Sequence, residues 1–246
     1  NSVEVPLCLD SSFSEALLSG GQVYYGRPLL NSINAEDEKM DEVIPIAKKT
    51  GGAILALTTE TSVPVKAEDR LVYAKKILDR LLAEGFNRND VIFDVLSLTA
   101  SAMRDGAIET FRTIELIEKE LGCATTYGLS NSSFGLPNRR FIHQAYLFQG
   151  IQHGLSSAIM NVMEKDISVR VEAAEIFSQR EKAVDDYLDR WPTPIPEDAS
   201  TAPASSGEKE DVVDPTENMN LSELEKEIFW DVADGKKDKI VKDIEI

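Results

Sequence analysis

Short apolar runs alternate with longer amphipathic stretches along most of this chain. Six runs have the length and composition of buried strands: residues 5–10, 28–33, 53–58, 91–95, 125–130 and 157–161. Each run is followed by a helical pattern. Because strands that alternate with helices form βαβ units, the pattern predicts an α/β fold with a parallel sheet.

Two of the predicted helices stand out by their periodicity. Residues 69–82 carry apolar side chains at helical spacing, with charged side chains assigned to the other face, and residues 107–121 repeat this arrangement. A further helical pattern begins near Asn138, with Pro137 in place for its first turn and Asn138 able to cap it. Residues 167–191 predict one more helix.

A polar residue stands at or just past the end of each predicted strand. These residues are Asp10, Asn31, Thr58, Asp94, Asn131 and Asn161. In a (β/α)₈ TIM barrel all strand ends converge on one face, where barrel enzymes keep their chemistry, whereas an open doubly wound sheet converges only at its switch point. The barrel is therefore the favoured fold. Since six strands are found and the chain starts directly before one, we expect the N-terminal two βα units to be missing.

The composition changes sharply after the last predicted helix. Residues 191–219 are rich in Pro, Ala, Ser and acidic residues, which predicts a flexible linker after a partial barrel at residues 1–190. Residues 220–246 carry two short amphipathic stripes, and we expect them to begin a second, helical module.

Charge and cysteine content narrow the classes of function. With 43 acidic and 26 basic residues the net charge is −17, which argues against a nucleic-acid surface. No run is long enough to span a membrane, and we expect no signal peptide. Cys8 and Cys123 have no metal-ligand spacing and are expected in the core, so a cytoplasmic setting without a metal site is predicted.

The loop at residues 128–140, G-L-S-N-S-S-F-G-L-P-N-R-R, carries the most specific signal. It places Asn131 just past a strand, among small residues that let a ligand approach the backbone. Gly128 and Gly135 bracket the turn. The alternative is an ordinary βα connection in which Asn131 satisfies its own backbone.

With this loop, four further motifs resemble the pterin-binding domain of cobalamin-dependent methionine synthases and the methyltetrahydrofolate:corrinoid methyltransferases. They are P-L-C-L-D-S (6–11), G-R-P-L-L-N-S-I (26–33), V-I-F-D (91–94) and G-L-S-S-A-I-M-N (154–161), in the family's order. The family fold is a (β/α)₈ barrel. Residues from 221 onward resemble the helical cap of a corrinoid-binding module. The D-x-H-x-x-G motif that ligates cobalamin is absent, so the resemblance implies a corrinoid presented by another module or protein.

The resemblance implies a methyl transfer from methyltetrahydrofolate to the cobalt(I) of the corrinoid. It implies pterin binding by a set of residues at the strand ends and in the loop: Asp10, Asn31, Asp94, Gly128, Ser130, Asn131, Arg139 and Asn161. Asn131 is the candidate for accepting a hydrogen bond from the leaving nitrogen, and Asp94 for supporting it electrostatically. Helix capping is the alternative role for Asp10 and Asp94. Arg140 is a weaker candidate than Arg139 for ligand contact, and His143 and His153 are expected to be packing or surface residues.

Two other functions remain open on the sequence. A dihydropteroate synthase-like enzyme would share the barrel but would need a basic pyrophosphate site. A non-catalytic pterin- or folate-binding module would hold the ligand without turnover. The expected partners are a small-molecule folate and a corrinoid-binding domain or protein, and a homodimer is compatible with this interpretation.

Overall fold

The computed structural model describes residues 5–164, 166–178 and 180–191, all in the first of two compact units of the chain. The predicted linker at 191–219, apart from Trp191, and the predicted helical segment at 220–246 lie outside the described residues.

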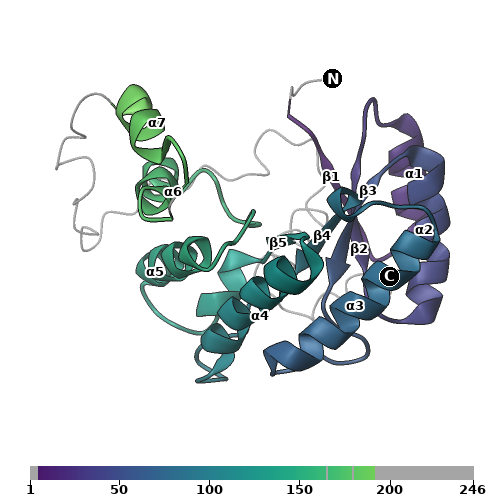
Figure 1. The fold of residues 1–246 in the computed structure, drawn as a ribbon, viewed down its shortest axis with the longest axis horizontal. Helices are drawn as coiled ribbons and strands as arrows, with labels where there is room; N and C mark the ends of the chain where they lie inside the picture. Colours follow the sequence, from purple (N-terminus) through teal and green to yellow (C-terminus); the bar gives the residue numbers. More distant parts are fainter. Residues whose placement is uncertain (1–4, 165, 179, 192–246) are drawn as a thin grey trace, which may run out of the picture. The chain divides into compact units, whose positions relative to one another are not determined.

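Five parallel strands form a single sheet among the described residues, and they are ordered in the sheet as they are along the chain (Figure 1). The strands are β1 (Cys8–Asp10), β2 (Leu29–Ile33), β3 (Ala53–Leu57), β4 (Val91–Asp94) and β5 (Ala124–Thr126). This consecutive order lacks the reversal of an open doubly wound sheet. The predicted α/β fold with a parallel sheet is confirmed, while closure into an eight-stranded barrel and the missing units stay predictions.

The sixth predicted strand is present only as a single bridge. Gly128 and Ile159 pair in parallel. The N–H of Ser157 donates to the carbonyl of Thr125 at 3.0 Å, and the N–H of Ile159 donates to that of Tyr127 at 2.9 Å. The segment thus follows the edge of β5, and its end lies beside the ends of the other strands.

Helices connect the strands and cover the sheet (Figure 1). They are α1 (Ser14–Val23), α2 (Asp37–Thr50), α3 (Ala67–Ala83), α4 (Gly106–Leu121) and α5 (Arg139–Gln152), with short 3-10 helices η1 (Arg88–Asp90) and η2 (Leu129–Ser133). The helices predicted at 69–82 and 107–121 are confirmed within two residues at each end. Their buried apolar faces, including Ile77 and Ile114, pack with strand residues such as Ile54 and Phe93 into one core.

The prediction of one helix over 167–191 is wrong, because the structure has two, α6 (Ile167–Glu175) and α7 (Ala183–Arg190). Lys182 has a left-handed φ of 67°, which ends any continuous helix there. Tertiary contacts favour the break: Phe177, in the connection, contacts Phe148 of α5. The indole N–H of Trp191, just past α7, donates to Glu172 of α6 at 2.6 Å.

Three local predictions also need correction. Cys123 is buried but Cys8 is exposed, because β1 is at the edge of the sheet formed by the described residues. The strand predicted to reach Ser130 ends at Thr126, since η2 begins at Leu129. Asn138 precedes α5 in a left-handed conformation and makes no side-chain cap hydrogen bond. The N-terminus of α5 is organised by Arg139 instead, as described below.

Candidate functional site

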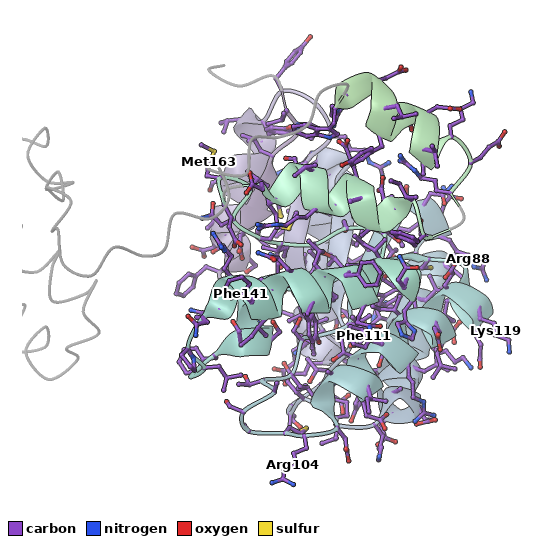
Figure 2. The ribbon with its side chains drawn as sticks, turned by 90° about the vertical axis from the view of Figure 1, so that its left-hand side faces the viewer. Arg88, Arg104, Phe111, Lys119, Phe141 and Met163 are labelled. Atoms are coloured by element: carbon purple, nitrogen blue, oxygen red, sulfur yellow. The ribbon has the colours of Figure 1, made fainter. Side chains whose placement is uncertain are left out.

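The polar residues at the strand ends gather along one edge of the sheet. Asp10 on β1 is in register with Asn31 on β2, and Asp94 on β4 pairs with Leu57 of β3 and Thr126 of β5. Figure 2 shows Phe141 and Met163, from the segments that follow this edge, on one side of the molecule. Arg88 and Lys119, which precede β4 and β5, lie on the opposite side. The strand ends therefore lie along one edge of the sheet, and their convergence in a closed barrel stays a prediction.

Asp10 and Asn31 line a cavity of about 250 Å³ together with Ser11, Ser32, Asn34 and Lys39. The alternative that Asp10 caps a helix is wrong, because α1 has Phe13 at its N-cap and no side-chain cap hydrogen bond. Within the described part of the chain, neither the Asp10 nor the Asn31 side chain forms a hydrogen bond. A carboxylate and a carboxamide are thus both available to a ligand here.

Asp94 differs from Asp10 in being buried, with 8% of its surface exposed. Its Oδ1 accepts a hydrogen bond of 2.8 Å from the N–H of Leu96, so it closes a tight turn at the end of β4. It does not cap α4, which begins only at Gly106. Burial raises the pKa of Asp94 to about 6, although the Leu96 N–H and the charge of Arg70 act in the opposite direction.

Thr58, the polar residue at the end of β3, has a structural role. Its N–H and its hydroxyl both donate to the main-chain carbonyl of Asp94, at 3.1 and 3.0 Å. Thr58 is fully buried. It therefore fixes the backbone that carries the Asp94 carboxylate.

The loop at 128–140 folds as η2 followed by a turn at Gly135, whose φ of 76° is a conformation that favours glycine. Gly128 has an ordinary φ of −78°, so it is needed for its small size. A Cβ at Gly128 would lie 3.2 Å from Nδ2 of Asn131. The Asn131 amide is exposed and makes no hydrogen bond within the described residues, so the alternative that it satisfies its own backbone is wrong.

Arg139, the first residue of α5, reaches back over the loop. Its Nε donates to Oγ of Ser133 at 2.9 Å, and its Nη2 donates to the carbonyl of Ser130 at 2.7 Å. Ser133 in turn lies 2.7 Å from Nε2 of His143, and Nδ1 of His143 lies 3.5 Å from Oε2 of Glu164. These four residues form a continuous polar chain, which we call the Arg139 network.

The Arg139 network borders a second cavity, of about 390 Å³. It is lined by Leu129, Ser130, Arg139, Arg140, His143, Met160, Asn161, Glu164 and Ile167. Asn161 is exposed, and its Oδ1 accepts a hydrogen bond of 3.0 Å from the N–H of Met163, which closes a turn. The structure thus divides the predicted residues between two cavities, and Asp94 and Asn131 line neither of them.

Several residues of this region were missed by the sequence analysis. Ser133 and Glu164 gave no signal, and His143, expected to be a packing or surface residue, belongs to the Arg139 network. Arg70 was assigned to the charged face of its helix, but it is fully buried, and its charge acts on Asp94. Its spacing of four and seven residues from the buried Ala74 and Ile77 was the available signal.

The donor set suits a flat, polar heterocycle. Carboxylates accept hydrogen bonds, and carboxamides both accept and donate them.

No cluster of three or more His, Cys, Asp or Glu side chains able to hold a metal ion occurs among the described residues. In the same part of the chain, no helix combines the length and hydropathy needed to cross a membrane.

Comparison with known proteins gives matches to pterin enzymes. Residues 1–161 match the family described as pterin binding enzyme. Methionine synthase of Mycobacterium tuberculosis (strain ATCC 25618 / H37Rv) is 29% identical over 172 residues, which cover 64% of this chain and 14% of that protein. Methylcorrinoid:tetrahydrofolate methyltransferase of Eubacterium limosum is 27% identical over 169 residues, which cover 67% of this chain and 62% of that protein. The chain spans less than two thirds of either relative.

Two solved structures share the fold. A dihydropteroate synthetase with product has a TM-score of 0.52 at 15% identity, covering 71% of this chain and 67% of that chain. Yersinia pestis DHPS with a pterine-sulfa conjugate also has a TM-score of 0.52, at 16% identity, covering 72% and 68%. At these identities the likeness concerns the fold alone.

Proposed function

The chain belongs to the pterin binding enzyme family, and we propose that it binds methyltetrahydrofolate and supports transfer of its methyl group to a corrinoid. The observation that carries this proposal is the amide of Asn131, which forms no hydrogen bond among the described residues and lies beside Gly128 in a loop at the strand ends. The two curated relatives described above, a methionine synthase and a corrinoid-dependent methyltransferase, support the same class of reaction.

Asp10, Asn31 and Asp94 are the proposed pterin-binding residues at the sheet edge. A pterin presents a ring N–H, an amino group and a carbonyl along one edge. A carboxylate accepts two parallel hydrogen bonds from such donors, and a carboxamide matches one donor next to one acceptor. Register pairs Asp10 with Asn31, so these two side chains reach one ligand edge from neighbouring strands.

Methyl transfer is difficult because a neutral tertiary amine is a poor leaving group. When the nitrogen–methyl bond breaks, its electron pair stays on the ring nitrogen, and a proton from solvent bonds to that nitrogen. The amide oxygen of Asn131 is proposed to accept a hydrogen bond from that N–H, an interaction that strengthens in the transition state. The ionised Asp94 stabilises the developing positive charge. The corrinoid, carried by another module or protein, supplies the cobalt centre that exchanges the methyl group.

Arg139 and Ser130 complete the proposed ligand contacts at the second cavity. The guanidinium of Arg139 is held by Ser133 and the Ser130 carbonyl, which leaves its Nη1 for a ligand oxygen. A guanidinium is suited to packing on a pterin face or binding a folate carboxylate. Asn161 lines the same cavity and is proposed to contact the ligand there.

A protein-sized partner must reach this edge if a corrinoid is to meet the pterin. Phe134, Phe141 and Met163 are exposed apolar side chains on the segments that surround it, with exposed fractions of 69%, 59% and 86%. Exposed apolar groups of this kind favour contact with a partner. They support a corrinoid-binding domain or protein as the partner.

The same site serves both directions of the reaction. The name of the Eubacterium limosum relative describes transfer from a methylcorrinoid to tetrahydrofolate. Forward and reverse reactions pass through the same transition state, so the contacts proposed for Asn131 and Asp94 apply to each. The direction in a cell then depends on which methyl donor the partner delivers.

The test is methyl transfer between methyltetrahydrofolate and cobalt(I) cobalamin, followed by absorbance, with the folate dissociation constant measured in parallel. Folate binding with transfer supports the proposal. Folate binding without transfer favours the non-catalytic binding module. Binding of a pterin pyrophosphate in preference to the folate would favour a dihydropteroate synthase-like enzyme.

A further inference from the structure

Arg70 is the one fully buried charged side chain among the described residues, and it lies on α3 with its neighbours Ala67 and Ala74 in the core. The other arginine of that helix, Arg80, forms surface ion pairs with Asp41 and Glu84. A buried guanidinium without a carboxylate partner is costly, because desolvation of the charge must be offset by hydrogen bonds. The contacts of Arg70 therefore point to a specific role.

The guanidinium of Arg70 joins the two loops that follow β3 and β4. Its Nε donates to the carbonyl of Pro64 at 2.9 Å. Its Nη1 donates to the carbonyls of Val95 at 2.6 Å and Leu96 at 3.1 Å. The Thr110 hydroxyl of α4 lies 3.2 Å from the same Leu96 carbonyl, but its one proton has a nearer acceptor in the Gly106 carbonyl at 2.9 Å. The Leu96 carbonyl is thus held chiefly by Arg70.

Leu96 is the residue that orients the Asp94 carboxylate. Its N–H donates to Oδ1 of Asp94, and its φ of 58° is a conformation that residues with a side chain rarely adopt. Anchoring the Leu96 carbonyl keeps this conformation in place. Release of that carbonyl would let Leu96 relax and would free the Asp94 side chain to turn.

We propose that Arg70 is a positioning residue for Asp94: it locks Leu96 so that the carboxylate stays directed toward the pterin. Arg70 itself is fully buried and acts only through Leu96 and through its charge. The proposal rests on the pterin-binding role of Asp94 put forward above.

The charges around Arg70 agree with this role. Burial lowers the pKa of Arg70, while Tyr146 of α5, Glu109 of α4 and Asp94 of β4 raise it. Arg70 is the charged residue that offsets the effect of burial on Asp94. Nη2 of Arg70 has no hydrogen-bond partner in the described part of the chain. The guanidinium therefore lacks one of the hydrogen bonds that a purely stabilising role would favour.

The first test measures the Asp94 carboxyl directly and needs no enzymatic activity. Carbon-13 NMR titrations of the full chain, labelled at aspartate, compare the wild type with Arg70→Lys and Arg70→Met. Asp94→Asn assigns the resonance. Loss of the charge in Arg70→Met should raise the pKa of Asp94 by about one unit. Arg70→Lys keeps the charge and should shift it less. An unchanged Asp94 titration in Arg70→Met overturns the proposal.

The second test follows folate binding against pH in the same variants. In Arg70→Met, the pH below which folate affinity is lost should rise by the same amount as the Asp94 pKa. Arg80→Met, on the same helix, is the matched control and should leave both readouts unchanged. A uniform loss of affinity at all pH values, without a rise in the pH below which affinity is lost, would mean that Arg70 only supports the fold. If the wild type binds no folate, the proposed function fails, while the NMR titration still decides the role of Arg70.

Discussion

The hydroxyl of Ser133 lies 2.7 Å from Nε2 of His143 and accepts a hydrogen bond of 2.9 Å from Nε of Arg139. Arg139 donates to Ser133, Ser133 lies within hydrogen-bond distance of His143, and the other ring nitrogen of His143 faces Glu164. The arrangement fixes a guanidinium at the edge of the proposed ligand site.

Substitution Ser133→Ala should weaken folate binding about tenfold, because Arg139 loses a charge-assisted hydrogen bond that orients it. Ser132→Ala is the matched control. The buried Ser132 hydroxyl donates to the Leu129 carbonyl at 2.7 Å and does not contact Arg139. Calorimetric titration should show full affinity for this control. Equal losses in the two variants would show that Arg139 is not held for ligand binding.

Substitution Asp94→Asn should stabilise the protein at pH 7.5. Burial raises the pKa of Asp94 to about 6, so the folded state keeps its proton where the unfolded chain has lost it, and stability falls as pH rises from about 4 to about 6. Above that window the penalty is constant, at most about 3 kcal/mol. The melting temperature of Asp94→Asn should exceed that of the wild type at pH 7.5 and match it near pH 4. A variant that gains nothing at pH 7.5 would contradict the raised pKa.

Substitution Asn131→Ala should lower the rate of methyl transfer about a hundredfold and leave folate affinity nearly unchanged, because its contact is proposed to form in the transition state. Transfer to cobalt(I) cobalamin under saturating folate gives the rate. Asn138→Gly is the control in the same loop. Asn138 has a left-handed φ that glycine also adopts, and its side chain makes no cap hydrogen bond. A rate as low in Asn138→Gly would mean that the loop, not the Asn131 amide, is responsible.

Substitution Glu109→Gln should destabilise the protein by about 1 kcal/mol at pH 7. The buried Glu109 of α4 accepts a hydrogen bond of 2.9 Å from the first N–H of α3, on Ala67, and pairs with Lys66 at 3.1 Å. The Ala67 N–H and Lys66 lower the pKa of Glu109, so its contribution is present above the unfolded pKa and is lost as pH falls through the folded pKa.

Urea unfolding at pH 7 and pH 3.5 tests this pH dependence, since the difference between Glu109→Gln and the wild type should shrink at the lower pH. Glu120→Gln is the control on α4, the helix that also carries Glu109. It removes a surface ion pair with Lys75 of α3 and should change stability by less than about 0.5 kcal/mol. A similar loss in both variants would show that general surface charge, not capping of α3, accounts for the effect.

The sequence by itself determined the order of the elements and the edge at which the polar residues gather. Short apolar runs and helical periodicity depend on local burial, so the five strands and the helices at 69–82 and 107–121 are predicted within a few residues. Parallel strands in chain order bring their ends together, which placed Asp10, Asn31 and Asp94 at one edge. The loop at 128–140 was specific enough to indicate a pterin enzyme, a family to which the chain belongs.

Only the tertiary structure decided which of these side chains are free and which are engaged. Thr58 and Asn161 look like Asp10 and Asn131 in sequence, but Thr58 bonds to the Asp94 carbonyl and Asn161 closes its own turn. Arg70 and His143 were missed because their roles come from residues distant in the chain, Val95 and Leu96 for one and Ser133 and Glu164 for the other. Hydrogen bonds and desolvation act through space, so a charged residue in a local pattern does not show whether it meets water, a carbonyl or a ligand.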